Sequence, residues 1–339
     1  MTKLELKKLK STRKAPLPEF IDPELATLVK EPTDGPGWLH ELKFDGYRML
    51  CTLNRREVRF WSRNRKDWTA RFPNVEKALR SFPATTAILD GEIVVMDDKG
   101  HTSFQLLQRA MGGGGDTAFV FAVFDLLYLD GYNLTGVALI ERKLVLQQLF
   151  SAVADGGPLR YSDHVEGNGK KFFRQACDFG IEGIVSKRAD AHYISARTHD
   201  WLKIKCARNQ EFVIVGYTPS KKGLPGFGSL ILGVYEKGKL IYAGRVGTGF
   251  SLKQREEIAR KLDRLSRSSS PLAVIPKEPG LRQAHWAKPK LVAEVTFTEW
   301  TADGSIRHPS FQGLREDKAA EEVRREVPKK TPAARRSSR

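Results

Sequence analysis

Cysteine and long apolar runs are the two features this sequence has little of, and each shortage excludes a class of protein. The 339 residues contain three cysteines, Cys51, Cys177 and Cys206. They form no Cys-x-x-Cys pair and no His/Cys spacing of zinc ligands, so we expect neither a zinc site nor a disulfide framework, and a reducing cytoplasm fits. No apolar run reaches the length of a membrane-spanning helix, about 18 residues or more. The basic N-terminus has no apolar stretch behind it, so it does not read as a secretory signal.

Acidic residues are scarce relative to basic ones. The sequence has 57 Lys and Arg against 40 Asp and Glu, a net charge of +17. Residues 1–14 hold six basic side chains and one acidic one, and residues 328–339 hold five basic side chains and no acidic one. A charge of +7 therefore remains for residues 15–327. A basic body with basic tails favours a polyanionic partner, above all nucleic acid, over the alternative that the charge serves solubility alone.

The length predicts two domains, with basic segments at both ends. After a Pro- and Gly-rich entry over 15–40, strand-like runs alternate with helical stretches. Beyond Cys206, short strands and Gly-rich turns surround one helix, a pattern typical of a small OB-type barrel. The predicted boundaries are 1–17 (basic extension), 18–206 (first domain), 207–325 (second domain) and 326–339 (basic, disordered tail). Predicted strands cover 47–53, 58–61, 87–96, 119–128, 183–187, 201–206, 211–217, 229–235, 239–246 and 291–300. Predicted helices cover 74–80, 104–110, 140–149, 170–179 and 252–266.

Lys43 is the first candidate for chemistry. It comes just before an Asp45-Gly46 turn that leads into the predicted strand at Tyr47. A lysine at the mouth of a strand can present its amine to a ligand. Because the ordinary lysine pKa is about 10.4, a nucleophilic lysine needs cationic neighbours or burial to lose its proton. The alternative is a surface lysine beside a common Asp-Gly hairpin turn.

Two glutamates stand at strand positions where an acid is unusual. Glu92 lies inside an apolar strand, after Asp90-Gly91, and Glu182 precedes Gly183 at a strand entrance. Such carboxylates either face solvent at a strand end or are paired or bound to a divalent ion, which prefers oxygen ligands. Lys203 and Lys205 share one face of a strand, where they are either solvated or bind phosphate. Together with Lys43, these residues meet the needs of nucleotidyl transfer.

In this order, the motifs resemble those of the nucleotidyltransferase superfamily, which includes ATP-dependent DNA ligases, RNA ligases and mRNA capping enzymes. The chain is most similar to the ligase module of bacterial end-joining ligases of the ligase D type, over roughly residues 18–320. The resemblance is carried by Lys43-x-Asp45-Gly46-Tyr47-Arg48, Ser62-Arg63-Asn64, Asp90-Gly91-Glu92, Phe124-Asp125-Leu126-Leu127-Tyr128, Glu182-Gly183-Ile184-Val185, Trp201-Leu202-Lys203-Ile204-Lys205, Glu299-Trp300-Thr301, Arg307-His308-Pro309 and Arg315-x-Asp317-Lys318.

The resemblance implies a fold, a reaction and a set of site residues. The fold is α+β, with an adenylation (nucleotidyltransferase) domain of antiparallel sheets and helices followed by an OB-fold β-barrel. The activity is that of a DNA ligase (ATP) that joins 3′-OH and 5′-phosphate ends through AMP bound covalently to Lys43. Nucleotide-binding roles fall on Glu41, Arg48, Arg63, Glu92, Phe124, Arg197, Lys203, Lys205, Arg315 and Lys318. Glu92 and Glu182 would hold Mg²⁺ or Mn²⁺.

The implied partner is nicked or broken duplex DNA, with a Ku-type end-binding protein as a further candidate. We expect a cytoplasmic, nucleoid-associated monomer active in DNA repair and end joining, without a membrane partner. An RNA ligase or another covalent nucleotidyltransferase is the alternative activity, and a non-catalytic basic DNA-binding protein is a third. No polymerase or phosphoesterase module accompanies the motifs, which leaves a stand-alone enzyme and an excised module as alternatives. Arg65 and Ala196 stand where the family commonly has glycine, so their loops are expected to differ locally.

Overall fold

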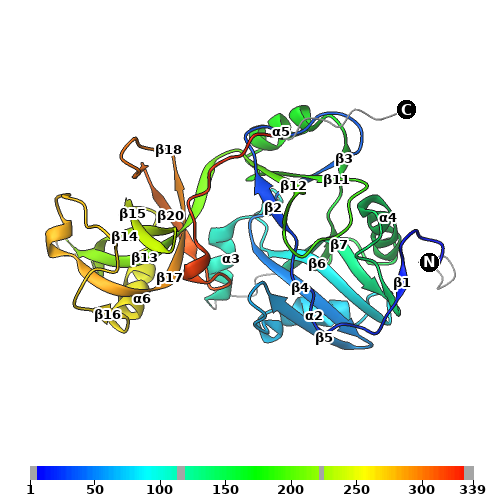
Figure 1. Cartoon of the computed structure of the whole chain (residues 1–339). Helices are drawn as coiled ribbons and strands as arrows, with labels where there is room; N and C mark the ends of the chain where they lie inside the picture. Colours follow the sequence, from blue (N-terminus) through cyan, green and yellow to red (C-terminus); the bar gives the residue numbers. More distant parts are fainter. Residues whose placement is uncertain (1–5, 113–118, 221–224, 332–339) are drawn as a thin grey trace. The chain divides into compact units, whose positions relative to one another are not determined.

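The chain folds into two units, each with its own hydrophobic core. The structure is a computed structural model that describes residues 6–112, 119–220 and 225–331. One unit comprises residues 1–206 together with 328–339, and the other comprises residues 207–327 (Figure 1). None of the helices within the described ranges combines the length and apolarity that a membrane crossing requires.

The larger unit contains a seven-stranded sheet whose strands follow the order β1-β8-β7-β6-β4-β5, with β9 also paired to β7. Its neighbours are antiparallel except for the parallel β7–β9 pair. The strands are β1 (Arg13–Lys14), β4 (Tyr47–Asn54), β5 (Glu57–Ser62), β6 (Thr86–Val94), β7 (Val120–Leu129), β8 (Tyr132–Asn133) and β9 (Leu159–Tyr161). The helices packed against one face are α2 (Pro73–Leu79), α3 (Phe104–Met111) and α4 (Leu139–Phe150).

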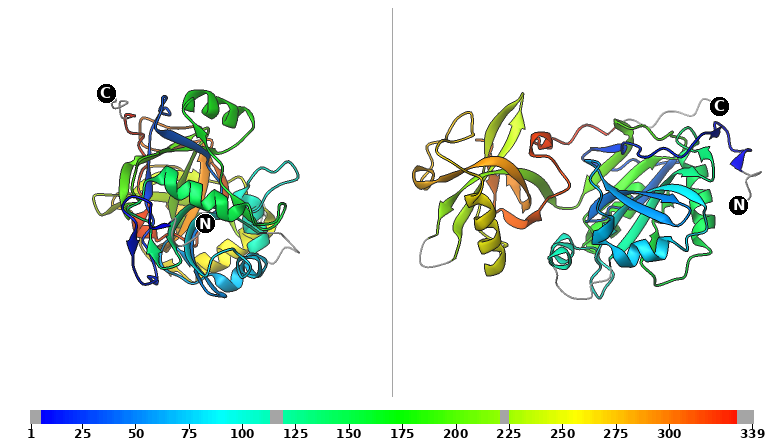
Figure 2. Two further views of the ribbon diagram at one scale, coloured as in Figure 1. Left: turned by 90° about the vertical axis from the view of Figure 1, so that its right-hand side faces the viewer. Right: turned by 90° about the horizontal axis from the view of Figure 1, so that it is seen from below.

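A second sheet in the same unit has the order β10-β3-β11-β12-β2, in which only the β12–β2 pair is parallel. Its strands are β2 (Leu25–Leu28), β3 (Trp38–Leu42), β10 (Val165–Glu166), β11 (Gly183–Arg188) and β12 (Arg197–Lys205). Helix α5 (Gly169–Asp178) packs on one face through Ala176, against Ile184, Leu202 and Ile204. Helices α4 and α5 are separate in Figure 2, and they pack on different sheets of this unit.

The remaining faces of the two sheets share a small core. Leu50, Ile88 and Leu127 of the seven-stranded sheet cluster with Tyr193 and Trp201 of the β11–β12 region. Charged side chains border this core, as described below. The two inner faces therefore form a partly polar interior, which the alternation of polar and apolar residues along β4 and β12 makes possible.

The smaller unit is built on a six-stranded antiparallel sheet of order β15-β14-β13-β17-β16, with β20 also paired to β17. Ile258 and Leu262 of helix α6 (Leu252–Asp263) enter its core. A Ser251–Gln254 capping box begins this helix. In the described residues the sheet does not close into a complete barrel. The strands are β13 (Arg208–Pro219), β14 (Phe227–Glu236), β15 (Lys239–Val246), β16 (Ser266–Arg267), β17 (His285–Phe297), β18 (Glu299–Trp300), β19 (Ile306–Arg307) and β20 (Ser310–Leu314).

Three expectations from the sequence are wrong or incomplete. Cys177 and Cys206 form a disulfide, whereas the spacing of the cysteines had indicated none. The fold brings them together from positions 29 residues apart, which spacing rules for short motifs do not detect. The extended entry over 15–40 contains β2 and the first residues of β3. Within the segment expected to be a disordered tail, Lys329 pairs with Val29, while residues 332–339 lie outside the described part.

Candidate active site

Lys43 lies where the chain passes from one sheet to the other. It follows β3 of the five-stranded sheet, and Tyr47 begins β4 of the seven-stranded sheet. The Asp45-Gly46 pair is therefore a crossing between sheets and not a hairpin turn. A Cβ on Gly46 would lie 2.2 Å from the carbonyl oxygen of Ile93, so glycine is required for this close approach. Asp45 fixes the crossing by accepting a hydrogen bond from the backbone N–H of Phe104 at 3.2 Å.

Glu182 is the partner of Lys43. Strands β3 and β11 are antiparallel neighbours, and the backbone N–H of Lys43 donates to the carbonyl of Gly183 at 2.9 Å. This pairing places the residue that follows β3 beside the residue that precedes β11. The Nζ of Lys43 donates a hydrogen bond to Oε2 of Glu182 and forms an ion pair with it. Both side chains are mostly shielded from solvent, with exposed fractions of 21% for Lys43 and 10% for Glu182.

The charges around Lys43 differ from those that the sequence had suggested. Nucleophilic use of a lysine had called for cationic neighbours or burial; Lys43 is mostly buried, but the charged groups that act on its pKa are acids. Burial by itself lowers the pKa of Lys43, yet Glu182, Asp45 and Glu92 outweigh burial and raise the pKa above its ordinary value. Lys43 is therefore held as an ammonium ion until this ion pair is broken.

Lys203 and Lys205 occupy the face of β12 that the alternation predicted. Leu202 and Ile204 are fully buried beside α5, whereas the two lysines are half-buried on the opposite face. Lys203 stands across from Val185 of β11, which in turn stands across from Glu41 of β3. Because cross-strand partners share a face of a sheet, Glu41, Lys203 and Lys205 lie on the same side as Lys43.

Arg48 and Phe124 meet at the inner face of the seven-stranded sheet. The guanidinium of Arg48 forms two hydrogen bonds with Asp90, at 3.0 and 2.6 Å, and lies 5.3 Å from the centre of the Phe124 ring. Tyr193 donates to Asp90 at 2.7 Å. The Phe124 ring packs edge-on against Trp201, with ring centres 6.0 Å apart. Burial lowers the pKa of Arg48, but Asp90 outweighs this and raises it, so the guanidinium stays charged.

Glu41 is buried and saturated with hydrogen bonds. One carboxylate oxygen accepts from Lys143 at 2.9 Å, and the other accepts from Lys187 and Ser162, each at 3.0 Å. Burial raises the pKa of Glu41, but the two ammonium groups outweigh burial and lower it. The Lys187 ammonium also lies 4.3 Å from the centre of the Phe124 ring, so this cluster is continuous with the Phe124 surroundings.

Several residues of this interior were missed from the sequence. Lys143 lies on α4, Ser162 follows β9, and Tyr193 lies in the loop between β11 and β12. Arg142, also on α4, forms two hydrogen bonds with Asp125, next to Phe124, at 2.7 and 2.8 Å. The useful signal was the Arg142-Lys143 pair among the leucines and valine of this helix, since paired cations at core positions require carboxylate partners.

The other predicted residues of this unit lie at the edges of the same interior. Glu92 is the cross-strand partner of Arg48 and contributes to the electrostatic environment of Lys43. Arg63 follows β5 and is half-buried. Arg197 begins β12, is exposed, and donates to the backbone carbonyl of Ala26. Arg65 has a φ of +56°, a conformation in which glycine is favoured, whereas Ala196 is not among the residues with positive φ.

Arg315 and Lys318 belong to the smaller unit, where each is paired with acids of that unit. Arg315 contacts Asp317 at 2.8 Å and Glu294 at 2.9 Å, and Lys318 contacts Glu211 at 2.6 Å. Burial raises the pKa of Glu211, but Lys318 and Arg315 lower it to about 2. The two cations are thus held in a network next to β13 and β17.

Similarity to known proteins agrees with this geometry. Residues 23–205 match the family described as the ATP dependent DNA ligase domain, and residues 224–318 match the ATP dependent DNA ligase C terminal region. The chain is 42% identical over 329 residues to the multifunctional non-homologous end joining protein LigD of Pseudomonas aeruginosa, covering 96% of this chain and 39% of that protein. It is 37% identical over 291 residues to the multifunctional non-homologous end joining DNA repair protein LigD of Mycobacterium tuberculosis, covering 85% and 37%.

A solved structure is similar over most of the chain. It is a mycobacterial DNA ligase D complexed with ATP and MES, with 35% identity and a TM-score of 0.64, and the match covers 89% of this chain and 98% of that one. The chain spans about two fifths of the length of the curated LigD relatives.

Proposed function

This chain belongs to the ATP-dependent DNA ligase family, and we propose that it joins 3′-OH and 5′-phosphate DNA ends through AMP carried on Lys43. One observation carries the proposal. Lys43 lies at the crossing between two sheets, where it pairs with Glu182; Lys203 lies on the same face of its sheet, and Arg48 and Phe124 meet on the inner face of the other sheet. Transfer of AMP to a lysine nucleophile uses each of these groups.

The first step is attack by the Lys43 amine on the α-phosphorus of ATP. The new bond is a phosphoramidate between Nζ and phosphorus, and pyrophosphate leaves. Lys43 must first lose its proton, and its ion pair with Glu182 opposes that loss. Separation of Lys43 from Glu182 removes this opposition, and the ammonium then releases its proton to solvent before the amine attacks, while Lys203 and Arg48 attract the phosphates.

The carboxylates near Lys43 fit a divalent cation. Glu182 and Glu92 both lie close enough to raise the pKa of Lys43, and carboxylate oxygens are the ligands that Mg²⁺ and Mn²⁺ prefer. No group of three or more His, Cys, Asp or Glu side chains gathers for a metal within the described residues. Mg²⁺ commonly uses one or two carboxylates and completes its shell with water and substrate phosphates. When bound, the ion neutralises phosphate charge.

The proposed stacking partner of the adenine is Phe124, over whose ring the Arg48 guanidinium and the Lys187 ammonium lie at 5.3 and 4.3 Å from the ring centre. Arg63 and Arg197, at the edges of the interior, are proposed contacts for the ribose and phosphates. Glu41 orients the site mainly through Lys187, since its carboxylate already accepts three hydrogen bonds. Glu41 is therefore proposed to position Lys187 next to the adenine and not to contact the adenine directly.

Arg315 and Lys318 are proposed to meet the leaving pyrophosphate during the first step only. Both lie in the smaller unit and are bound to acids there, so contact with pyrophosphate requires them to exchange partners. Domain movement of this kind separates the nucleotide step from the DNA step in two-domain enzymes.

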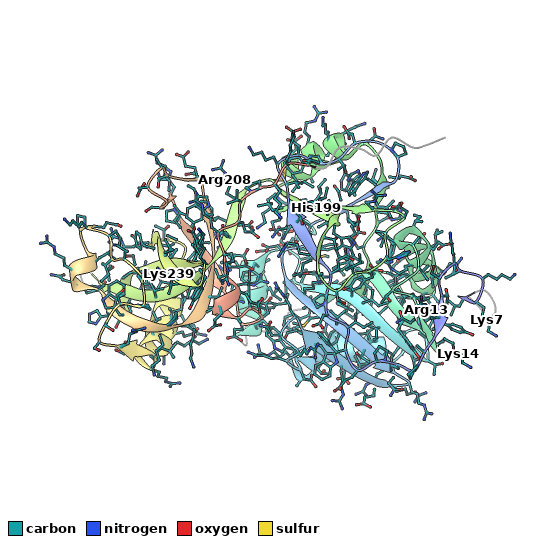
Figure 3. All side chains as sticks on the ribbon, viewed as in Figure 1. Lys7, Arg13, Lys14, His199, Arg208 and Lys239 are labelled. Carbon is teal, nitrogen blue, oxygen red and sulfur yellow. A yellow bond between two sulfur atoms is a disulfide. The ribbon has the colours of Figure 1, made fainter. Side chains whose placement is uncertain are left out.

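Duplex DNA is the proposed substrate, bound mainly through its phosphates, because a ligase accepts any sequence. The N-terminal segment carries the exposed cations Lys7, Arg13 and Lys14, the last two in β1 (Figure 3). The LigD relatives are named as end-joining proteins, so the proposed role is break repair in the bacterial cytoplasm. A monomeric enzyme, assisted by a Ku-type end-binding protein, fits this role.

The test is covalent labelling followed by nick sealing. With ATP labelled at the α-phosphate and Mg²⁺ or Mn²⁺, the wild type should carry label through a denaturing gel. Lys43→Ala should carry none, while Lys77→Ala, an exposed lysine on α2, should match the wild type. An unlabelled wild type would exclude a covalent mechanism. Labelling with sealing of RNA 3′-OH ends alone would instead establish the RNA ligase alternative.

A further inference from the structure

The Cys177–Cys206 disulfide lies at the base of the loop that carries Glu182. Cys177 belongs to the last turn of α5, and Cys206 follows β12. Between α5 and β11 the chain contains only residues 179–182. The backbone N–H of Cys206 donates to the carbonyl of Glu182 at 2.9 Å, and the N–H of Ile181 donates to the carbonyl of Ala176 at 2.9 Å. The loop is therefore tied to Cys206 at one end by the disulfide and at the other by a hydrogen bond.

Cys206 also marks a boundary of the fold. It is the last residue of the larger unit before the chain enters the smaller one at Ala207. Lys205, which lies on the same face of β12 as Lys203, immediately precedes Cys206. The disulfide thus restrains three features together: the Glu182 loop, the end of β12 and the start of the connection between the units.

Two glycines lie on either side of Glu182. Gly183 has a φ of +155°, and a Cβ there would lie 2.0 Å from the carbonyl oxygen of Ile204. Gly180 has a φ of +73° at the end of α5. Two glycines flanking a short segment give it conformational freedom when it is not tethered. A cross-link at the base of the loop is therefore well placed to limit that freedom.

We propose that Cys177 and Cys206 are a redox-sensitive positioning pair, whose disulfide holds the loop of Glu182 so that this carboxylate pairs with Lys43 at rest and binds a divalent cation once that pair opens. The inference rests on the proposed function of Glu182. Cytoplasmic disulfides are commonly transient or redox-sensing, so the pair would cycle between two states in the proposed compartment. Oxidation by a low-molecular-weight disulfide joins the two sulfurs, and the two electrons and two protons leave with two small thiols. Reduction by a dithiol reverses this exchange.

Reduction should loosen the Glu182 loop while leaving Arg48 and Phe124, on the seven-stranded sheet, in place. The expected result is a rise of roughly tenfold in the Mn²⁺ concentration that half-saturates adenylation of Lys43, the scale that loss of outer-shell support has in metal sites. The KM for ATP should rise less than the Mn²⁺ requirement: Lys203 and Lys205 lie on β12 beside Cys206, but Arg48 and Phe124 belong to the other sheet, which the disulfide does not join. A loss of folding alone would not separate these two quantities.

The experiment compares the full chain treated with oxidised glutathione and with dithiothreitol. Hydrogen exchange of the 178–183 amides is measured with no nucleotide or metal present, and adenylation is measured against Mn²⁺. The double variant Cys177→Ser/Cys206→Ser retains Cys51, the buried free thiol. It should behave like the reduced wild type in both buffers, with fast exchange of the loop and a high Mn²⁺ requirement.

Each outcome decides one question. Equal loop exchange and equal Mn²⁺ requirement in the two wild-type states would overturn the inference while leaving the ligase function standing. A redox response that persists in the double variant would assign the effect to Cys51 and would also overturn it. Absence of adenylation in every state would contradict the proposed function, and the exchange measurement would still report whether the disulfide restrains the loop.

Discussion

The ammonium of Lys43 is hydrogen-bonded to the carboxylate of Glu182, a residue 139 positions away in the sequence. The contact exists because the end of β3 and the start of β11 are neighbours in one sheet. It joins the proposed nucleophile to a proposed metal ligand, so one side chain must leave the other before either can act. In the resting site this single ion pair therefore keeps Lys43 from attack and Glu182 from binding a metal ion.

The ion pair predicts how adenylation depends on pH. The carboxylates raise the pKa of Lys43, so the amine fraction of the free enzyme grows about tenfold per pH unit throughout the neutral and mildly alkaline range. The rate constant for adenylation at sub-saturating ATP should follow this slope from about pH 6.5 to about pH 9. Rapid-quench labelling with α-labelled ATP measures it. A plateau near pH 7 would show that the free enzyme holds Lys43 as a neutral amine.

His40 predicts a loss of stability in acid. It is fully buried on β3, hydrogen-bonded through Nδ1 to Ser186 at 2.8 Å, and burial lowers its pKa to about 4. The unfolded chain binds a proton near pH 6.5, so it holds more protons than the folded state between about pH 6.5 and pH 4. Stability is therefore complete above about pH 6.5 and declines as the pH falls toward 4, by about 3 kcal/mol at most.

Urea unfolding near neutral pH and at about pH 4.5 measures this loss. His40→Asn keeps a polar group facing Ser186 and removes the titration, so its stability should fall less between the two pH values. An equal decline in wild type and variant would assign the acid sensitivity to other groups.

Arg142 should be among the most sensitive positions for folding. It is fully buried and forms two hydrogen bonds with the buried Asp125. Arg142→Met leaves the buried Asp125 carboxylate without its guanidinium partner, and breaking a buried ion pair in this way costs about 3–5 kcal/mol of unfolding free energy. Arg59→Met breaks the exposed pair with Glu57 and should leave the free energy of unfolding nearly unchanged, because solvent screens that pair. Guanidinium unfolding of the two variants gives the comparison, and similar values for both would contradict the buried-pair argument.

Gly183 and Gly238 offer a matched test of backbone space. A Cβ at Gly183 would meet the Ile204 carbonyl at 2.0 Å, whereas a Cβ at Gly238 would find no atom within 4 Å, although both have positive φ. Gly183→Ala should separate β11 from β12 and abolish Lys43 labelling. Gly238→Ala should cost only the strain of its conformation, about 1 kcal/mol. If labelling survives in Gly183→Ala, strands β11 and β12 can move far enough apart to accommodate the added Cβ.

The N-terminal segment should contribute to DNA affinity. Lys7, Lys8 and Lys10 carry cationic side chains beside Leu6, whose buried side chain anchors the segment to the core. Changing the three lysines to Gln should reduce the slope of log affinity against log salt by about 0.9 for each DNA phosphate that they neutralise in the wild type. Fluorescence anisotropy with a nicked duplex measures this slope. Adenylation of Lys43 should be unchanged, which serves as the control. An unchanged salt slope would show that these three lysines do not bind DNA phosphates.

Much of the local structure could be predicted from the sequence. The strand from Tyr47, the helix from Phe104 and the lysine face of β12 follow from alternation, helical periodicity and turn residues, which are local properties. The β2 strand was missed because Leu25–Leu28 is short and lies within a Pro-rich segment. The predicted single strand over 291–300 is instead β17 followed by β18, because strand ends depend on partners more than on propensity.

The sequence by itself determined which residue types the site could use: a lysine at a strand mouth, two glutamates at strand positions and a pair of lysines on one face. The tertiary structure alone decided their partners. It set Glu182 against Lys43, surrounded Glu41 with Lys143 and Lys187, and joined Cys177 to Cys206. The physical reason is that charge and thiol pairing depend on strand register and burial, and both arise only when distant segments pack together.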